Sequence, residues 1–173
     1  LWVRALRFAT PHSRFPIPDS RPWRMSNPYH SAILDHSRVP HRRGVLAQPP
    51  HCGCGENSLC GDSLSVQLRV EAGCIVGYAF EAEACAIVVA TASMLGDALV
   101  GHVPTRLEAI EADLRRLLGQ TQPEPDEALA VRLGALADLA EMRALPRRHR
   151  CVTLALEAVG AALIGSGAAN RTT

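Results

Sequence analysis

Residues 64–71 read Leu-Ser-Val-Gln-Leu-Arg-Val-Glu and alternate strictly between apolar and polar side chains. This two-residue period predicts a strand with one buried face. Ala72 and Gly73 supply a turn, and the apolar residues within 74–80 predict a second strand. Because the connection is too short for a parallel crossover, we expect the two strands to pair as an antiparallel hairpin.

Helical patterns follow the hairpin. Residues 85–99 are nearly all small or aliphatic, which is typical of a helix buried on most sides. A stripe of Leu and Ile over residues 107–117 predicts a surface helix that ends at Gly119. Thr105 and Glu108 have the spacing of a capping box, so we expect them to begin this helix.

Three more helices complete the predicted helical layer. One begins at Ser26 or Asn27 and is stopped by Pro40, and the other two span residues 126–145 and 148–164. The fold class is therefore α+β, with a small antiparallel β-sheet packed against a helical layer in a single domain.

Composition excludes several classes of protein. The chain has 173 residues, 47% of them hydrophobic, which is enough to bury one core. Residues 1–50 hold eight Arg and two Asp, whereas residues 51–142 hold five Arg and fourteen acidic residues. This segregation argues against a uniformly basic nucleic-acid-binding domain, and no apolar run reaches membrane-spanning length. We expect neither a nucleic-acid partner nor a membrane partner.

The ends of the chain differ from its middle. Residues 1–26 are rich in Arg and lack periodic apolar positions, so we expect a disordered N-terminal extension. The same composition is typical of a transit peptide, but Met25 resembles a natural start, which favours a dispensable segment. The predicted domain covers residues 27–164, and residues 165–173 are expected to form a frayed C-terminal tail.

The six cysteines bear on location and chemistry. They are too few for a disulfide-stapled protein, and no secretory signal is visible, so we expect reduced thiols and a cytoplasmic location. Half of them lie in residues 51–62, which read His-Cys-Gly-Cys-Gly-Glu-Asn-Ser-Leu-Cys-Gly-Asp. This Gly-rich composition predicts a loop.

Four side chains with metal-binding chemistry stand at predicted element boundaries. Cys60 and Asp62 precede the first hairpin strand, Cys85 begins the buried helix, and Cys151 lies in the first turn of the last helix. Helix N-termini stabilise thiolates, so we expect lowered pKa values for Cys85 and Cys151. Three thiolates and a carboxylate suit Zn²⁺ or Fe²⁺. The alternative is that each cysteine is a small buried hydrophobic residue, which is our interpretation of Cys74.

Four ordered motifs carry a family resemblance. They are Asn-Ser-Leu-Cys-Gly-Asp at 57–62, Phe-Glu-Ala-Glu-Ala-Cys-Ala-Ile at 80–87, Ala-Thr-Ala-Ser-Met at 90–94, and Pro-Arg-Arg-His-Arg-Cys-Val-Thr-Leu at 146–154. These motifs resemble those of the U-type iron–sulfur cluster scaffold proteins, the family that includes IscU, SufU and the N-terminal domain of NifU. The resemblance covers about residues 27–164, and four motifs in order are far more specific than any one alone.

The resemblance implies a fold, a site and partners. It implies the SufE/NifU-like fold and a metal site of Cys60, Asp62, Cys85 and Cys151, which holds zinc or iron. A transient iron–sulfur cluster is expected on Cys60, Cys85 and Cys151. The implied partners are a cysteine desulfurase, which passes persulfide sulfur to Cys60, and apo-proteins that receive the cluster.

The SufU branch of the family fits best. The stretch between Cys85 and Cys151 is long, as in the SufU type, and Arg150 stands where the IscU type places a ligand histidine. His149 comes one position too early, which rotates its side chain by about 100° on a helix. We therefore favour a solvated or capping His149 over a ligand.

Some residues depart from the family pattern. Ala82 and Ala84 replace two glycines, so any left-handed backbone there would be strained, and Ser58 replaces a proline. Cys52 and Cys54 have no counterpart. We favour a pair of spare thiols over an accessory sulfur or metal relay.

The sequence thus predicts an iron–sulfur cluster assembly protein that works as a scaffold or zinc-dependent sulfur acceptor. A sulfur-transfer protein with permanent zinc and no cluster is the first alternative. A structural zinc module that binds a partner is the second. Whether the sulfur transfer counts as enzymatic is left open by the residues.

Overall fold

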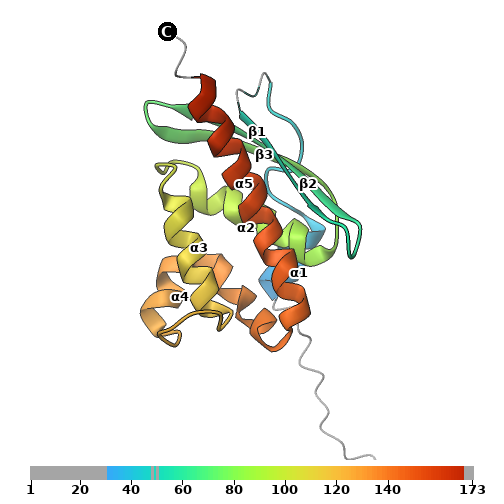
Figure 1. Cartoon of the computed structure of the whole chain (residues 1–173), viewed down its shortest axis with the longest axis vertical. Coiled ribbons are helices and arrows are strands. Elements are labelled where there is room, and N and C mark those ends of the chain that lie inside the picture. Colours follow the sequence, from blue (N-terminus) through green and yellow to red (C-terminus); the bar gives the residue numbers. More distant parts are fainter. Residues whose placement is uncertain (1–30, 48, 50, 170–173) are drawn as a thin grey trace, which may run out of the picture.

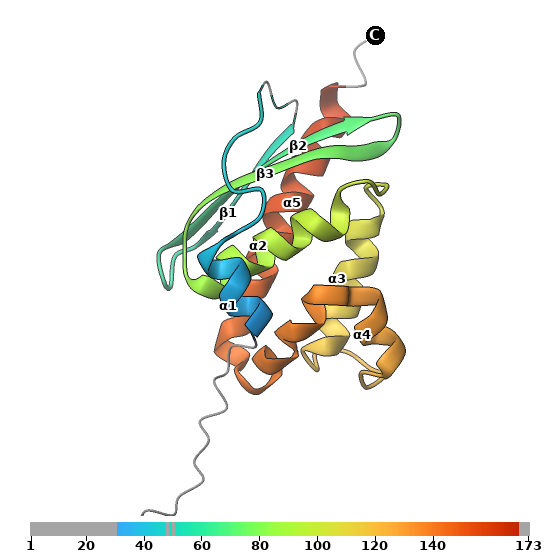
Figure 2. The same ribbon diagram turned by 180° about the vertical axis from the view of Figure 1, so that it is seen from behind.

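A computed structural model describes residues 31–47, 49 and 51–169 of the chain. It contains an antiparallel sheet with strands in the order β1-β2-β3. The long helix α5 and helix α2 cover one face of this sheet, while α3 and α4 lie at the end of the molecule away from it (Figure 1, Figure 2). The α+β class predicted from the sequence is confirmed.

The elements follow one another without repetition. They are α1 (Ser31–Arg38), β1 (His51–Asn57), β2 (Asp62–Glu71), β3 (Cys74–Glu83), α2 (Ala86–Leu99), α3 (Arg106–Leu117), α4 (Glu127–Leu133), the 3₁₀ helices η1 (Gly134–Ala144) and η2 (Pro146–Arg148), and α5 (His149–Ala169). The expected extension 1–26 and the expected helix start at Ser26 or Asn27 lie outside the described residues. None of the described helices combines the length and hydrophobicity that crossing a bilayer requires.

The predicted hairpin is present. Leu64, Val66 and Leu68 of β2 are buried, and β2 pairs with β3 in antiparallel register. Ala72 and Gly73 both have positive φ, 49° and 79°, which is the backbone of a tight hairpin turn. Strand β3 continues beyond the predicted end, so that its last residues reach the same end of the sheet as the start of β2.

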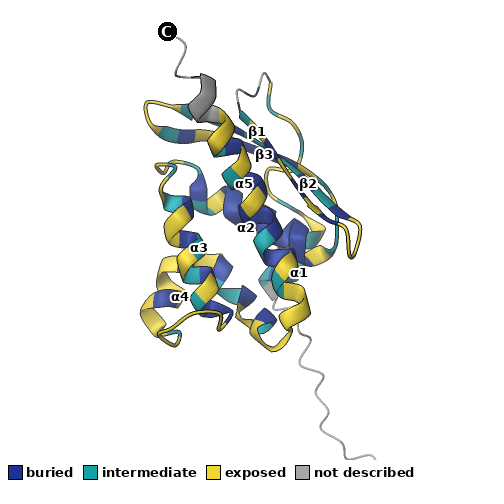
Figure 3. Cartoon of the chain, viewed as in Figure 1, coloured by how far each residue is buried: buried dark blue, intermediate teal, exposed yellow. Residues whose placement is uncertain are grey.

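The prediction of a loop over residues 51–62 is wrong for the first part of this stretch, because His51–Asn57 form strand β1. Gly53, Gly55 and Asn57 are buried and alternate with exposed neighbours, and the two glycines lie against α5. Figure 3 shows this mixture of buried and exposed positions along the sheet. A Cβ on Gly53 would lie 2.2 Å from the carbonyl oxygen of Ala158, so only glycine lets the strand approach the helix this closely. The buried face of β1 is thus made of backbone.

The buried residues of the helices agree with the predicted apolar stripes, whereas the observed helix ends differ from the predicted ones. The stripe of α3 is buried as expected, but Thr105 makes no side-chain capping bond and has helical angles, so the capping box is wrong. The single helix expected over 126–145 is broken at Gly134, whose φ of 56° interrupts the α-helical path. Helix α5 continues through Gly165 to Ala169, where we expected a frayed tail.

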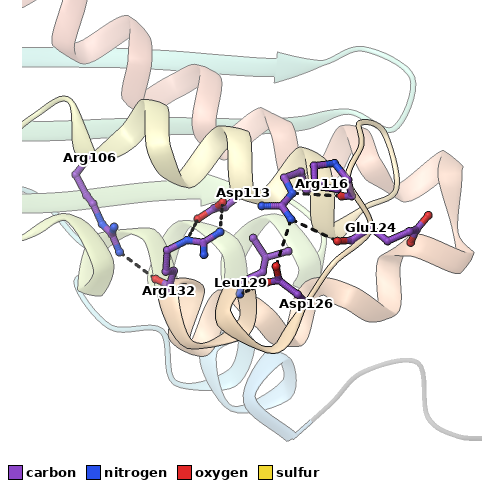
Figure 4. A network of polar contacts seen from close by, with 8 residues as sticks. Arg106, Asp113, Arg116, Glu124, Asp126, Leu129 and Arg132 are labelled. Atoms are coloured by element: carbon purple, nitrogen blue, oxygen red, sulfur yellow. Dashed lines mark hydrogen bonds and ion pairs between the residues drawn. The ribbon is translucent and has the colours of Figure 1, made fainter.

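Charged side chains connect α3 to α4. Arg132 donates hydrogen bonds of 2.9 and 2.8 Å to the two carboxylate oxygens of Asp113, and Arg116 lies 3.7 Å from Asp126 (Figure 4). Arg106 adds a bond of 3.0 Å to the carbonyl oxygen of Arg132. These contacts hold α4 against α3.

Candidate metal and sulfur site

Three of the four residues singled out by sequence stand at the starts of three elements. Asp62 is the first residue of β2, Cys85 is the N-cap of α2, and Cys151 lies in the first turn of α5. Cys60 lies in the short connection between β1 and β2. Because α2 and α5 both pack against the sheet, these ends lie together.

Three of the four donor groups form a tight set. A carboxylate oxygen of Asp62 and the sulfur atoms of Cys85 and Cys151 all lie within 4.8 Å of one another. Cys60 stands outside this set, but its Sγ lies 2.9 Å from Oδ2 of Asp62. The structure therefore gathers Asp62, Cys85 and Cys151 and leaves Cys60 at the edge of the group.

Asp62 organises the site. Its Oδ1 accepts a hydrogen bond of 2.9 Å from the backbone N–H of Cys85, and its Oδ2 faces Cys60 and, at 4.0 Å, Cys151. Its side chain is buried, with 6% exposed. A carboxylate in such surroundings needs partners, and this one has them on both oxygens.

A turn built by Asn57 presents Cys60. The carbonyl oxygen of Asn57 accepts hydrogen bonds from the backbone N–H groups of Cys60, at 3.2 Å, and Gly61, at 2.9 Å. Gly61 has a φ of 72°, which glycine adopts without strain. Asn before a Gly-containing turn is a typical turn signal, and it is the feature of the sequence from which the role of Asn57 could have been predicted.

The four donors differ sharply in access. Cys60 is exposed, Cys85 is half-buried, and Cys151 is buried. A protein partner can therefore reach Cys60 directly, whereas Cys151 can act only on something already within the site.

Electrostatics corrects one expectation. Burial, and next the charge of Cys85, raises the pKa of Cys151 to about 11, with a hydrogen bond from Arg148 acting in the opposite direction. We expected the start of α5 to lower it; loss of water outweighs the helix dipole at this depth. The hydrogen bond to Asp62 raises the pKa of Cys60, because the thiol is the donor and the thiolate is not.

The donor set suits a borderline transition ion. Three sulfur atoms and one carboxylate oxygen match the ligands that Zn²⁺ and Fe²⁺ accept in tetrahedral sites. A buried carboxylate next to two thiols also concentrates negative charge once the thiols ionise, which a divalent cation would balance. The residues present therefore fit a bound zinc or iron ion.

Two further residues from the sequence analysis point away from this site. The ring nitrogens of His149 lie 3.0 Å from Nε2 of Gln120 and 2.9 Å from the carbonyl oxygen of Met142. Arg150 pairs with Glu157 instead of approaching the thiols. Both ring nitrogens of His149 thus have partners outside the group of thiols.

The departures from the family pattern are accommodated. Within the described part of the chain, the non-glycine residues with positive φ are Arg42 and Ala72, so Ala82 and Ala84 carry no such strain. Cys52 and Cys54 are exposed on the face of β1 opposite α5.

Residues 28–136 match the family model described as the NifU-like N-terminal domain. The chain is 30% identical over 150 residues to the iron–sulfur cluster assembly scaffold protein IscU of Streptococcus pyogenes, covering 87% of this chain and 91% of the relative. It is 28% identical to the zinc-dependent sulfurtransferase SufU of Bacillus subtilis, covering 76% and 86%.

Solved structures agree with these relatives. A nitrogen-fixing NifU-like protein (N-terminal) from Brucella abortus superposes with a TM-score of 0.71 at 25% identity, covering 81% of this chain and 94% of the other. A putative iron–sulfur cluster assembly scaffold protein for the SUF system, from Fervidobacterium islandicum, gives 0.69 at 25% identity, covering 79% and 97%. Names from both the IscU and SufU branches thus occur among the similar proteins.

Proposed function

Because the chain belongs to the family of NifU-like N-terminal domains, we propose that it is an iron–sulfur cluster assembly protein that accepts persulfide sulfur at Cys60. The observation that carries this proposal is the gathering of Asp62, Cys85 and Cys151 beside an exposed Cys60. The names of the relatives, a cluster assembly scaffold and a zinc-dependent sulfurtransferase, support the same function.

The sulfur acceptor is Cys60 because access favours it. The Asn57 turn holds the thiol at the surface, where Asp62 accepts its hydrogen bond until the proton is lost to solvent. The thiolate then attacks the outer sulfur of a persulfide on a cysteine desulfurase. A new S–S bond forms on Cys60, the S–S bond of the donor breaks, and the donor cysteine leaves as a thiolate.

The other three residues hold the metal. Asp62, Cys85 and Cys151, joined by Cys60, are the proposed ligands, and a bound zinc ion would keep the thiolates ionised and protected from oxidation. Asp62 stays in place through its bond to the N–H of Cys85. Its harder oxygen donor makes the site more exchangeable than one with sulfur ligands alone.

The cluster itself is the cargo. An external electron donor would reduce the persulfide sulfur on Cys60 to sulfide, and iron and sulfide would then assemble on Cys60, Cys85 and Cys151 and pass to apo-proteins that need a cluster. One exposed and one half-buried cysteine leave the cargo a route to an acceptor protein.

The test is the location of the transferred sulfur. The chain is incubated with a cysteine desulfurase and cysteine, and the added sulfur is mapped by peptide mass spectrometry. We expect Cys60→Ser to abolish uptake while the circular dichroism spectrum stays unchanged. Cys74→Ser, a matched change at the far end of the hairpin, should retain uptake. Sulfur on Cys151 in the Cys60→Ser variant would overturn the assignment.

A protein with permanent zinc and no cluster is the second candidate, favoured by the zinc-dependent name of the Bacillus subtilis relative. Anaerobic reconstitution with iron and sulfide separates the two functions. A scaffold forms a cluster that can be transferred to an apo-acceptor, whereas a pure sulfur-transfer protein retains zinc and forms none.

A purely structural zinc module makes a different prediction. In that case Asp62→Ala would unfold the chain. The proposed function instead predicts a folded variant with impaired sulfur delivery.

A further inference from the structure

Two histidines and an aspartate meet near the C-terminal half of α2, away from the thiols. One ring nitrogen each from His36 and His41 and a carboxylate oxygen of Asp97 lie within 4.8 Å of one another. His36 lies on α1, His41 on the connector that follows it, and Asp97 on α2. Helix α1 packs beside α2, which brings the three together (Figure 2).

Ser93 holds both histidines in place. Its Oγ lies 2.8 Å from Nδ1 of His36 and accepts a hydrogen bond of 2.8 Å from the backbone N–H of His41. Ser93 is fully buried, so its position is fixed by the packing of α2. An oxygen that orients a ring from behind is the usual companion of a histidine ligand in metal sites.

The connector is also held from its other side. Arg42 has a φ of 61°, which is costly for a residue with a side chain, and its carbonyl oxygen accepts a hydrogen bond of 3.1 Å from the N–H of Phe80. Its Nε donates to Oδ1 of Asp97 at 3.2 Å. The carboxylate therefore keeps Oδ2 directed at Nδ1 of His41, 2.6 Å away.

We propose that His36, His41 and Asp97 form a second metal site, which binds a divalent transition ion without any sulfur ligand. The site is separate from the first, because Asp97 stands twelve residues beyond Cys85 along the α2 direction, or about 18 Å of helix. It goes beyond the proposed function, since none of its three ligands takes part in sulfur transfer.

The donor chemistry selects the class of ion. Imidazole nitrogen suits Zn²⁺ and Fe²⁺, whereas Mg²⁺ and Ca²⁺ require oxygen ligands and Cu⁺ prefers sulfur. Three protein ligands leave a position open for water, as in zinc sites that are not purely structural. An open hollow of about 410 Å³, lined in part by His36 and His41, gives an ion access from solvent.

Seating the ion requires the donor atoms to shift, and the pairs that lie up to 4.8 Å apart must approach by at most about 1.5 Å. Bonds of about 2.0–2.1 Å place the ligands of a tetrahedral zinc ion roughly 3.3 Å apart. His41 and Asp97 must therefore separate by less than about 1 Å as their shared proton leaves. Their side chains are 57% and 39% exposed, so both can move without disturbing the core.

Zinc binding by a chain that lacks the three cysteines of the first site tests the proposal. The full-length chain with Cys60, Cys85 and Cys151 all changed to Ser is dialysed against Zn²⁺, and bound zinc is measured. We expect it to retain a single zinc ion per chain, and His41→Ala or Asp97→Asn added to it should abolish this binding. Asp35→Asn is the matched control, because Asp35 carries the same charge beside the same hollow without belonging to the cluster. It should retain the ion.

Wild-type cysteines provide a second arm, which does not depend on folding of the triple variant. His41→Ala in the otherwise unchanged chain should lose one zinc equivalent while sulfur uptake at Cys60 continues. With Co²⁺ as the probe, the remaining spectrum should keep its thiolate-to-metal charge-transfer absorption. A folded triple variant that binds no zinc, or an equal loss with Asp35→Asn, would overturn the second site but leave the proposed function intact.

Discussion

The chain holds α5 against β1 and α4 against α3 by different means. At the first contact Gly53 lets backbone meet backbone, and a Cβ there would lie 2.2 Å from one helical atom and 2.3 Å from another. At the second contact Arg132 forms an ion pair with Asp113, and Arg116 forms a longer one with Asp126 (Figure 4). The first contact depends chiefly on the close fit of two backbones, whereas the second includes ion pairs of carboxylates near the surface.

The difference matters because the two contacts support different parts of the molecule. Helix α5 carries Cys151, and β1 leads into the turn that presents Cys60. The sulfur site is therefore placed by a contact that neither pH nor salt can weaken directly. The α3–α4 contact holds a segment of the helical layer away from the sheet, where partial opening would leave the thiols in position.

The largest expected effect comes from filling the backbone contact. Gly53→Val should lower the free energy of unfolding by about 3 kcal/mol or more, because its side chain must displace helical backbone. Urea denaturation followed by circular dichroism measures the loss. Cys54→Val is the matched control on the opposite face of the same strand and should stay within about 0.5 kcal/mol of the parent. Equal effects of the two changes would show that β1 does not depend on its glycine face.

Gly55→Ala should have a smaller effect at the same contact. A Cβ at this position would lie 3.0 Å from both a side-chain carbon and the carbonyl oxygen of Leu154, so a slight shift relieves the overlap. We expect a loss of about 1 kcal/mol in the same denaturation experiment. A stabilised variant would mean that the strand and helix are less closely packed than described.

The charged contact should respond to pH. The Arg132 guanidinium lowers the pKa of Asp113, so the carboxylate contributes stability above the pKa of the unfolded chain, near 3.9, and this contribution is lost as pH falls through the folded value. Asp113→Asn should therefore destabilise the protein at pH 7, by less than Gly55→Ala, and cease to differ from the parent well below pH 4. Thermal unfolding across this range, with Glu108→Gln on the same helix as the control, measures it. A difference that persists in acid would contradict the role of the charge.

The smallest effect is expected on the open face of β1. Cys52→Ser combined with Cys54→Ser should leave both stability and sulfur uptake nearly unchanged, because neither thiol contacts α5. Persulfide mapping after incubation with the desulfurase provides the measurement. A clear fall in uptake would instead assign these thiols to a sulfur relay.

Sequence reasoning succeeded wherever apolar side chains mark the buried face. Leu64, Val66 and Leu68 reveal β2, and the stripe of α3 is buried in the structure as predicted. Strand β1 was not predicted, because its buried positions hold two glycines and an asparagine. A strand without apolar side chains on its buried face shows no hydrophobic alternation. At Gly134 the stripe continues across a break, because burial of leucines does not require an unbroken α-helix.

The site also has features that the sequence predicts and features that it does not. Positions at element ends predict that Cys60, Asp62, Cys85 and Cys151 converge, and the structure gathers the last three within 4.8 Å while Cys60 lies at their edge. The pKa of Cys151 was not predictable in the same way, because depth of burial depends on how α5 packs. The cluster of His36, His41 and Asp97 left no sequence signal, since its members come from three segments without a common spacing.

Gly61 lies between an exposed residue and an anchored one. Its positive φ lies between Cys60, on the turn, and Asp62, which is tied to the start of α2. A Cβ at Gly61 would meet nothing within 4 Å, so this stretch of backbone stands in open space, while Asp62 is tied to the N–H of Cys85. Under the proposed function, three donors would stay in place while Cys60 swings out to meet the sulfur donor, so delivery would begin at the donor whose departure costs the least.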